Sequence, residues 1–339
     1  MSAALESTRP ADPSAIMALS TAYWGSQTLL TANRLRIFDA LADEPRTAAE
    51  VAAALSLDER TTGLLLNACV ALGLCDKSGE QFSNTPESAT YLVTSSPSSM
   101  ANAILYSDDL YGTWGQLESA LRSGTAPTRA ESYLGEDDAQ TRHFVYGMHD
   151  RALSIGQALP DLVDLDGRKR MLDAGGGPGT YSALLTARFS GLKAEVIELP
   201  GVARIGREIL ADTGAADRVT MIDGDYLETE FGDGYDVVLM SGMFHRESES
   251  NCRRLIDKAR GCLDAGGMLV VNDIFADAGG TGPVFAALFG LNMMLTAPDG
   301  GIHADADVAQ WMSEAGFENV GRKPFPPPMP HRVVTGVLP

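Results

Sequence analysis

Cysteine, basic side chains and long apolar runs are all scarce in this sequence, and each scarcity excludes a class of protein. The 339 residues include four cysteines, with no CxxC motif and no cysteine–histidine cluster. We therefore expect reduced thiols rather than a disulfide framework, and no metal site. Only 26 lysines and arginines stand against 45 acidic residues, a net charge of −19. Such a charge disfavours binding to nucleic acid or to an anionic membrane.

No segment has the pattern of a membrane span or a secretory signal. The longest apolar run, residues 284–297, contains Asn292 and is too short to cross a bilayer. The N-terminus has neither a basic start nor an apolar stretch. We therefore expect an acidic cytoplasmic protein, and its length predicts two domains.

The first hundred residues have the pattern of a winged helix. Thr47 and Glu50 form a capping-box signature for a helix over 48–55, and a second helix is expected over 58–72. Short extended pieces at 74–76 and 81–83 follow. Winged helices often read DNA, but residues 1–100 hold six basic and eleven acidic residues, a net charge of −5. That balance favours a leucine-rich dimer interface over DNA binding.

From residue 166 onward the pattern changes to alternating strands and helices. Such alternation predicts a mostly parallel sheet with crossover helices. The expected strands are 170–173, 193–198, 219–223, 235–240 and 267–273, and the expected helices are 181–189, 202–213 and 250–263. We divide the chain into a helical domain (1–105), linking helices that contribute to an acceptor pocket (106–160) and a Rossmann-like α/β domain (161–339).

A glycine-rich turn between a strand and a helix, RMLDAGGGPGT, indicates a nucleotide-like cofactor. Glu198, 21 residues after Gly177, ends the next strand, where a carboxylate accepts hydrogen bonds from a ribose diol. A nicotinamide dinucleotide and S-adenosylmethionine both fit this spacing. Asp173 and the tripeptide Gly224-Asp225-Tyr226 favour S-adenosylmethionine, because an acid there repels a pyrophosphate and suits a sulfonium and an amino group.

An ordered series of motifs resembles the two-domain, class I S-adenosylmethionine-dependent small-molecule O-methyltransferases. The motifs are LDAGGGPGTYS, VIELPGV, DRVTMIDGDY, YDVVLMSGMFH and LDAGGMLVVND. The resemblance implies a winged-helix dimerisation domain over about 14–100, a homodimer, and a cofactor site made by Asp173, Gly175, Gly177, Glu198, Asp225, Tyr226 and Ser241.

His245, which directly follows a sheet strand, is the expected general base for methyl transfer to oxygen. Two departures from the family pattern bear on this role. Arg246 and Glu247 stand where much of the family has Asp-Trp, and neither Asn272 nor the segment 300–303 plainly supplies the family's paired carboxylates. Asp273 and Glu247 both remain open as the partner of His245. Proximity-driven transfer, and transfer to carbon or nitrogen, also remain open.

The acceptor is expected to be a small aromatic metabolite held by helix residues. Phe144 and Met148 lie four residues apart and share a helix face, which suits a flat molecule but equally suits core packing. The further predicted acceptor contacts are His149, Asn292, Met294, Trp114 and His303. Two other classes compete with this reading: a non-methylating enzyme on the same fold, and a ligand-sensing winged-helix regulator that binds DNA.

Overall fold

The computed structural model describes residues 12–128 and 130–339. The start of the chain, where no secretory signal was found, lies mostly outside the described residues. The chain divides after Ala101, at the first residue of helix α7, into two compact units. Residues 106–160 belong to the second unit. In the described part of the chain, no helix is both long and apolar enough to cross a membrane.

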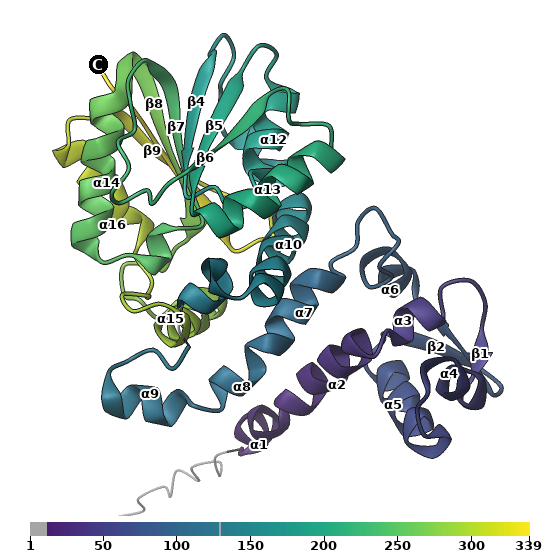
Figure 1. Ribbon diagram of the computed structural model, residues 1–339. Helices are drawn as coiled ribbons and strands as arrows, with labels where there is room; N and C mark the ends of the chain where they lie inside the picture. Colours follow the sequence, from purple (N-terminus) through teal and green to yellow (C-terminus); the bar gives the residue numbers. More distant parts are fainter. Residues whose placement is uncertain (1–11, 129) are drawn as a thin grey trace, which may run out of the picture. The chain divides into compact units, whose positions relative to one another are not determined.

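The N-terminal unit is a set of helices with a small antiparallel sheet of order β1-β3-β2 (Figure 1). Thr47 and Glu50 close the predicted capping box on α4, and Asp58 accepts from the Thr61 backbone N–H at 2.9 Å to cap α5. Its elements are α1 (Ser14–Thr21), α2 (Tyr23–Arg34), α3 (Ile37–Ala40), β1 (Arg46–Thr47), α4 (Ala48–Leu55), α5 (Glu59–Ala71), β2 (Cys75–Ser78), β3 (Gln81–Asn84) and α6 (Pro86–Tyr91).

The second unit opens with helices and continues as an α/β domain. The opening helices are α7 (Ala101–Asp109), α8 (Tyr111–Trp114), α9 (Leu117–Ser123), the π-helical turn η1 (Ser132–Glu136), α10 (Asp138–Ile155), η2 (Gly156–Ala158) and α11 (Leu159–Leu162). The α/β part comprises β4 (Arg170–Ala174), α12 (Thr180–Arg188), β5 (Lys193–Glu198), α13 (Pro200–Asp212), β6 (Val219–Asp223), β7 (Tyr235–Ser241), η3 (Phe244–Arg246), α14 (Glu249–Cys262), β8 (Leu263–Ile274), α15 (Val284–Thr296), α16 (Asp305–Glu314), β9 (Glu318–Pro324) and β10 (His331–Val337).

A seven-stranded sheet of order β6-β5-β4-β7-β8-β10-β9 forms the centre of this unit. Strands β4 to β8 pair in parallel, and β10 and β9 add an antiparallel edge. The predicted Rossmann-like fold is therefore confirmed. The antiparallel pair and helix α16 were not predicted.

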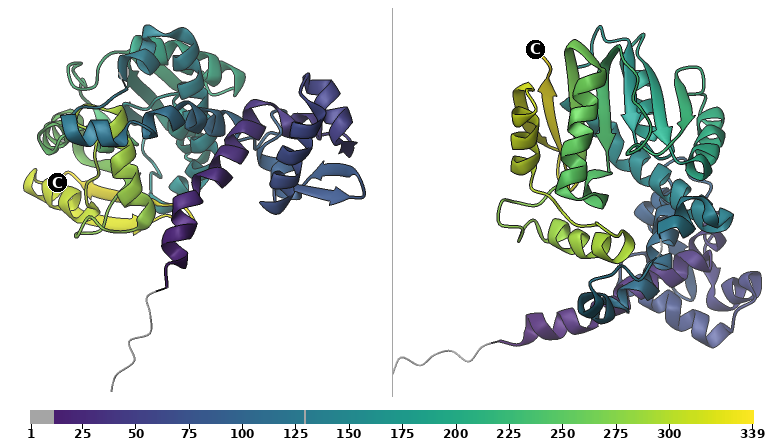
Figure 2. Two further views of the ribbon diagram at one scale, coloured as in Figure 1. Left: turned by 90° about the horizontal axis from the view of Figure 1, so that it is seen from below. Right: turned by 60° about the vertical axis from the view of Figure 1, so that its left-hand side comes forward.

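Helices cover both faces of the sheet. Alternate residues of β7 explain this: Val237 and Leu239 pack with α12 and α13, whereas Val238 and Met240 pack with α14 and α16. Figure 1 and the right view of Figure 2 show these helix pairs on opposite sides, with α15 beyond one end of the strands. That end is the carboxyl edge, where parallel strands deliver ligand-binding residues.

Candidate functional site

The glycine-rich turn after β4 brings the backbone close to a carboxylate. Gly175, Gly177 and Gly179 have φ values of +72°, +56° and +74°, which favour glycine. A Cβ on Gly176 would collide with the Asp173 carboxylate, and one on Gly175 would lie 3.0 Å from the Tyr226 ring. The turn therefore needs glycine both for its backbone shape and for its close neighbours.

Asp173 is fully buried at the end of β4. The Ser182 hydroxyl donates to its Oδ2 at 2.7 Å, while Oδ1 has no hydrogen-bond partner among the described residues. Burial, with a smaller contribution from the Glu198 charge, raises the pKa of Asp173 to about 7. A buried carboxylate with an unpaired oxygen is suited to a cationic ligand, as the sequence predicted.

Glu198 ends β5 on the same edge and is held by the backbone. Its Oε2 accepts from the Gly177 N–H at 2.9 Å, and its Oε1 accepts from the Leu199 N–H at 2.8 Å. Burial raises the pKa of this carboxyl, and the two backbone donors oppose that effect. Each oxygen keeps a lone pair for a further donor, as a ribose diol requires.

The remaining predicted cofactor residues lie on the neighbouring strand ends. The Tyr226 hydroxyl donates to Glu247 Oε1 at 2.7 Å, and the Ser241 hydroxyl accepts from Asn272 Nδ2 at 2.9 Å. Asn272 Oδ1 is buried without a partner in the described part of the chain. Asp225 is exposed, and its Oδ1 accepts from the Leu227 N–H.

These side chains fit S-adenosylmethionine. The unpaired Asp173 oxygen suits its positive charge, the Glu198 carboxylate suits its ribose, and the glycine turn leaves room for close approach. No group of three or more His, Cys, Asp or Glu side chains in the described residues is arranged to hold a metal ion.

His245 lies in η3, directly beyond the carboxyl end of β7. Its Nδ1 is 2.6 Å from Asp273 Oδ1, and its backbone N–H donates to Oδ2 at 3.3 Å. Asp273 also accepts from the Ile274 N–H at 2.7 Å. Burial acts to raise the pKa of Asp273, but the imidazole and these donors outweigh it, so the pKa is lowered.

The ionised Asp273 carboxylate can only accept a hydrogen bond, so His245 carries its proton on Nδ1 and leaves Nε2 free as the basic atom. Asp273 is thus the partner that the sequence left undecided. Glu247, the alternative, instead bonds the Tyr226 hydroxyl and accepts from Asn251 Nδ2 at 2.7 Å.

Helix α15 supplies apolar surface beside His245. The Phe289 ring meets the imidazole edge-on at 4.8 Å between centroids, and Phe285 stacks on Phe289 at 6.0 Å. Trp114 Nε1 donates to Asn292 Oδ1 at 2.9 Å, so two of the predicted acceptor contacts bind each other. Met294, on the same helix, is half-buried.

Phe144 belongs to an aromatic cluster with Tyr106 and Tyr133, at ring centroid distances of 5.4 and 5.1 Å. Met148, one helical turn further along α10, is half-buried. Tyr133 donates to the Thr296 carbonyl at 2.6 Å, which ties η1 to α15. The described contacts therefore gather α10, η1 and α15 around a set of aromatic rings.

Comparison with known proteins identifies the family. Residues 17–94 match the O-methyltransferase dimerisation domain, and residues 122–318 match the O-methyltransferase domain. The chain belongs to the O-methyltransferase family. Its members are S-adenosylmethionine-dependent enzymes, so the resemblance drawn from the motifs is confirmed.

Three relatives illustrate the extent of the match. The chain is 29% identical to the 3-hydroxy-5-methyl-1-naphthoate 3-O-methyltransferase of Streptomyces sahachiroi, covering 96% of this chain and 95% of the relative. It is 28% identical to the tetracenomycin polyketide synthesis 8-O-methyl transferase of Streptomyces glaucescens, covering 91% and 92%. Human N-acetylserotonin methyltransferase, solved with SAM, shares the fold at a TM-score of 0.88 and 23% identity, covering 98% and 99%.

Two predicted acceptor residues of this O-methyltransferase have other partners. His303 Nε2 lies 3.1 Å from the Phe244 carbonyl and 2.9 Å from the Glu247 carbonyl, so its ring contacts the backbone at both ends of η3. His149 Nδ1 lies 2.7 Å from Thr180 Oγ1, and the ring lines a largely apolar pocket of about 190 Å³ with residues of α12 and α13. Burial lowers the pKa of His149. For both residues the acceptor contact stays a prediction.

Sequence reasoning missed three side chains of the candidate site. Tyr133 and Phe289 follow no motif, and only the tertiary structure brings them to the edge where His245 lies. Arg246 was noticed only as a departure from the family pattern. Its Nη1 donates to the Tyr133 oxygen at 3.2 Å.

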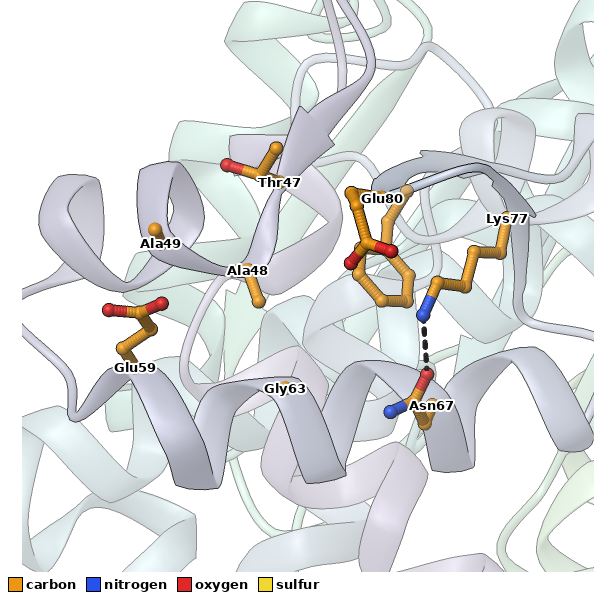
Figure 3. Close-up of a pocket in the computed structure, with 9 residues that line it drawn as sticks. Thr47, Ala48, Ala49, Glu59, Gly63, Asn67, Lys77 and Glu80 are labelled. Atoms are coloured by element: carbon orange, nitrogen blue, oxygen red, sulfur yellow. Dashed lines mark hydrogen bonds between the residues drawn. The ribbon is translucent and has the colours of Figure 1, made fainter.

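A second pocket, of about 200 Å³, lies within the N-terminal unit between α4, α5 and the β2–β3 hairpin (Figure 3). Lys77 Nζ donates to Asn67 Oδ1 at 3.2 Å on its wall. Glu59 and Glu80 are its acidic lining residues. No residue predicted for catalysis or binding lines this pocket, and it adds nothing to the O-methyltransferase site.

Proposed function

We propose that this enzyme transfers a methyl group from S-adenosylmethionine to a hydroxyl oxygen of a small aromatic molecule, with His245 as the general base. The observation that carries this proposal is the His245–Asp273 pair, held at 2.6 Å beyond the carboxyl end of the sheet and flanked by Phe289. Both Streptomyces relatives are named for O-methylation, one of a hydroxynaphthoate and one in polyketide synthesis, which supports an aromatic acceptor.

S-Adenosylmethionine supplies, when bound, a methyl group on a positively charged sulfur. Asp173 would hold the cofactor through its positive charge, and Glu198 would hold it through its ribose. His245 Nε2 accepts the proton of the acceptor hydroxyl, and Asp273 stabilises the imidazolium that forms. Such a base contributes about 10²- to 10⁴-fold in rate, while holding the two reactants together contributes on the order of 7–11 kcal/mol.

The proposed partners are the small-molecule acceptor and a second copy of the chain. The dimerisation-domain match supports a homodimer. Large apolar side chains of α1 and α2 are exposed, with Ile16, Leu19 and Trp24 at 74%, 77% and 62% of their surface. Burying these side chains in a dimer would remove them from water.

The four cysteines are free, which fits the proposed cytoplasmic location.

The test is methylation of a panel of one- to three-ring phenols, with the product analysed by mass spectrometry and NMR. O-Methyl products support the proposal, and methylation only at carbon or nitrogen would contradict it. His245→Ala is expected to lower turnover about 10²- to 10⁴-fold with little change in affinity for S-adenosylhomocysteine. His143→Ala is the matched control, because His143 is half-exposed and lies 3.4 Å from Asp109. Equal activity in both variants would refute the base assignment.

A further inference from the structure

Arg246 directly follows the proposed base in the sequence and carries a positive charge. It is the last residue of η3 and is half-buried. Its guanidinium lies over the Tyr133 ring at 5.7 Å, and its Nη1 donates to the Tyr133 oxygen. Because Tyr133 gives its own proton to the Thr296 carbonyl, the phenol oxygen is fixed as an acceptor for Arg246. This hydrogen bond fixes the orientation of the guanidinium. It uses one of the five guanidinium N–H donors and leaves the others for further groups.

No carboxylate among the described residues lies within ion-pair distance of Arg246. Its charge acts on Glu198 and Tyr226 among the cofactor residues and on Tyr106 and Tyr133 in the aromatic cluster. The guanidinium therefore lies where the cofactor residues meet the aromatic cluster. Arg151, a second arginine near Tyr106, is occupied differently, because its Nη2 donates to Ser107 Oγ at 2.9 Å and lies 3.5 Å from the Ala103 carbonyl.

The acidic residues at the carboxyl edge of the sheet make Arg246 important for binding any anionic ligand. Asp173, Glu198, Glu247 and Asp273 are all buried there, and together they would repel an incoming carboxylate. A guanidinium offsets that repulsion and matches a carboxylate with two parallel hydrogen bonds. A half-buried charge without an ionic partner is also costly in the free protein, and a bound anion relieves that cost.

We infer that Arg246 is the receptor for a carboxylate on the acceptor, and that the acceptor class is hydroxylated aromatic carboxylic acids. This inference rests on the proposed function. A carboxylate also ends the methionine part of S-adenosylmethionine, but the cationic part of the cofactor is assigned to Asp173. The hydrogen bond to Tyr133 places the Arg246 guanidinium beside the aromatic cluster of Tyr106, Tyr133 and Phe144. The acceptor is thus the source that the geometry favours.

The experiment measures binding to the enzyme loaded with S-adenosylhomocysteine, using hydroxybenzoic and hydroxynaphthoic acids and their carboxamides. Each acid and its amide have nearly the same shape and differ in charge. We expect the wild type to bind at least one acid about 10- to 100-fold more tightly than its amide. Arg246→Gln should abolish that preference, and Arg246→Lys should keep part of it. Tyr133→Phe should weaken it, because the guanidinium loses the oxygen that aligns it.

Arg122→Gln is the matched control, because Arg122 is 77% exposed and pairs with Glu118 on α9. It should leave the acid preference unchanged. If acids and amides bind alike to the wild type, the inference is overturned, and this comparison needs no variant to fold. A preference that survives in Arg246→Gln would overturn it as well.

A third set of binding measurements tests whether Arg246 binds a carboxylate of the acceptor or of the cofactor. The affinities of wild type and Arg246→Gln are compared for S-adenosylhomocysteine and for methylthioadenosine, which lacks the amino-acid carboxylate. Unchanged affinities support the acceptor assignment, and selective weakening of S-adenosylhomocysteine would overturn it. Failure of the proposed function looks different, because the wild type would then bind no S-adenosylhomocysteine or would methylate no phenol.

Discussion

Replacing Asp273 with asparagine removes one negative charge from the site and leaves the size of the side chain nearly unchanged. In the wild type, Asp273 Oδ1 accepts from both His245 Nδ1 and the Ile274 N–H. If the amide nitrogen of the substituted side chain turns toward His245, Nδ1 must become an acceptor and Nε2 must carry the proton. If the amide oxygen turns toward His245, the tautomer survives but the imidazolium loses its stabilising charge.

The magnitude follows from that charge. A carboxylate and an imidazolium whose nearest atoms are 2.6 Å apart have charge centres roughly 4 Å apart. At an effective dielectric constant of about 20 their attraction is ~4 kcal/mol. Since each 1.4 kcal/mol corresponds to about tenfold in rate, we expect Asp273→Asn to lower kcat by about 10³-fold. Both the KM of the acceptor and the affinity for S-adenosylhomocysteine should change little.

The assay is steady-state methylation of a phenol found in the acceptor panel, together with calorimetric titration of S-adenosylhomocysteine. Asp305→Asn is the control for losing a buried carboxylate. Asp305 accepts from Arg322 and Arg332 at 3.1 and 2.9 Å, so its loss should lower the melting temperature without removing the base. If Asp273→Asn keeps more than about a tenth of the turnover, the pair is structural and the reasoning fails.

Three further predictions concern the cofactor and the assembly. Because the pKa of Asp173 is raised to about 7, its carboxyl is protonated below that pH, and affinity for cationic S-adenosylmethionine should rise as pH increases from 5 to 7 and then level off. Calorimetry should show a weaker rise in affinity for S-adenosylhomocysteine, which lacks the sulfonium. The Asp173→Asn variant should show no rise in affinity with pH for either ligand. Equal pH slopes for the two ligands in the wild type would contradict this prediction. Glu198→Ala should weaken S-adenosylhomocysteine binding by about 1.5–3 kcal/mol. An unchanged affinity would show that Glu198 only stabilises the glycine-rich turn through the Gly177 N–H. Light scattering should give twice 35.9 kDa, with Leu19→Glu shifting the protein toward monomer, whereas a monomeric wild type would count against the dimer.

Features that depend on local sequence were predictable. Strands β5 and β6 have the predicted bounds, because apolar runs ending in an acid mark buried parallel strands. The capping box of α4 and the glycine turn after β4 were also apparent, since caps and tight turns need particular residue types. In contrast, β9 has exposed or half-exposed residues throughout and includes Arg322, Lys323 and Pro324, so no apolar alternation marked it.

Features that depend on pairing between distant segments were not predictable. The choice of Asp273 over Glu247 as the partner of His245 requires the β7–β8 register, in which Ser241 pairs with Asn272. That register brings the end of β8 beside η3. The contacts of His303 Nε2 with the Phe244 and Glu247 carbonyls likewise depend on the folded chain. Sequence spacing holds no information on which side of a loop such a ring will lie.

The three consecutive residues His245, Arg246 and Glu247 show why adjacency in sequence does not imply a shared role. Successive side chains in a 3₁₀ turn diverge by about 120°, and the chain leaves η3 in an extended conformation at Glu247. His245 therefore meets Asp273, Arg246 meets Tyr133, and Glu247 meets Tyr226. Because each side chain has its own partner, a substitution at 246 can change which acceptor is recognised while the His245–Asp273 hydrogen bond stays in place.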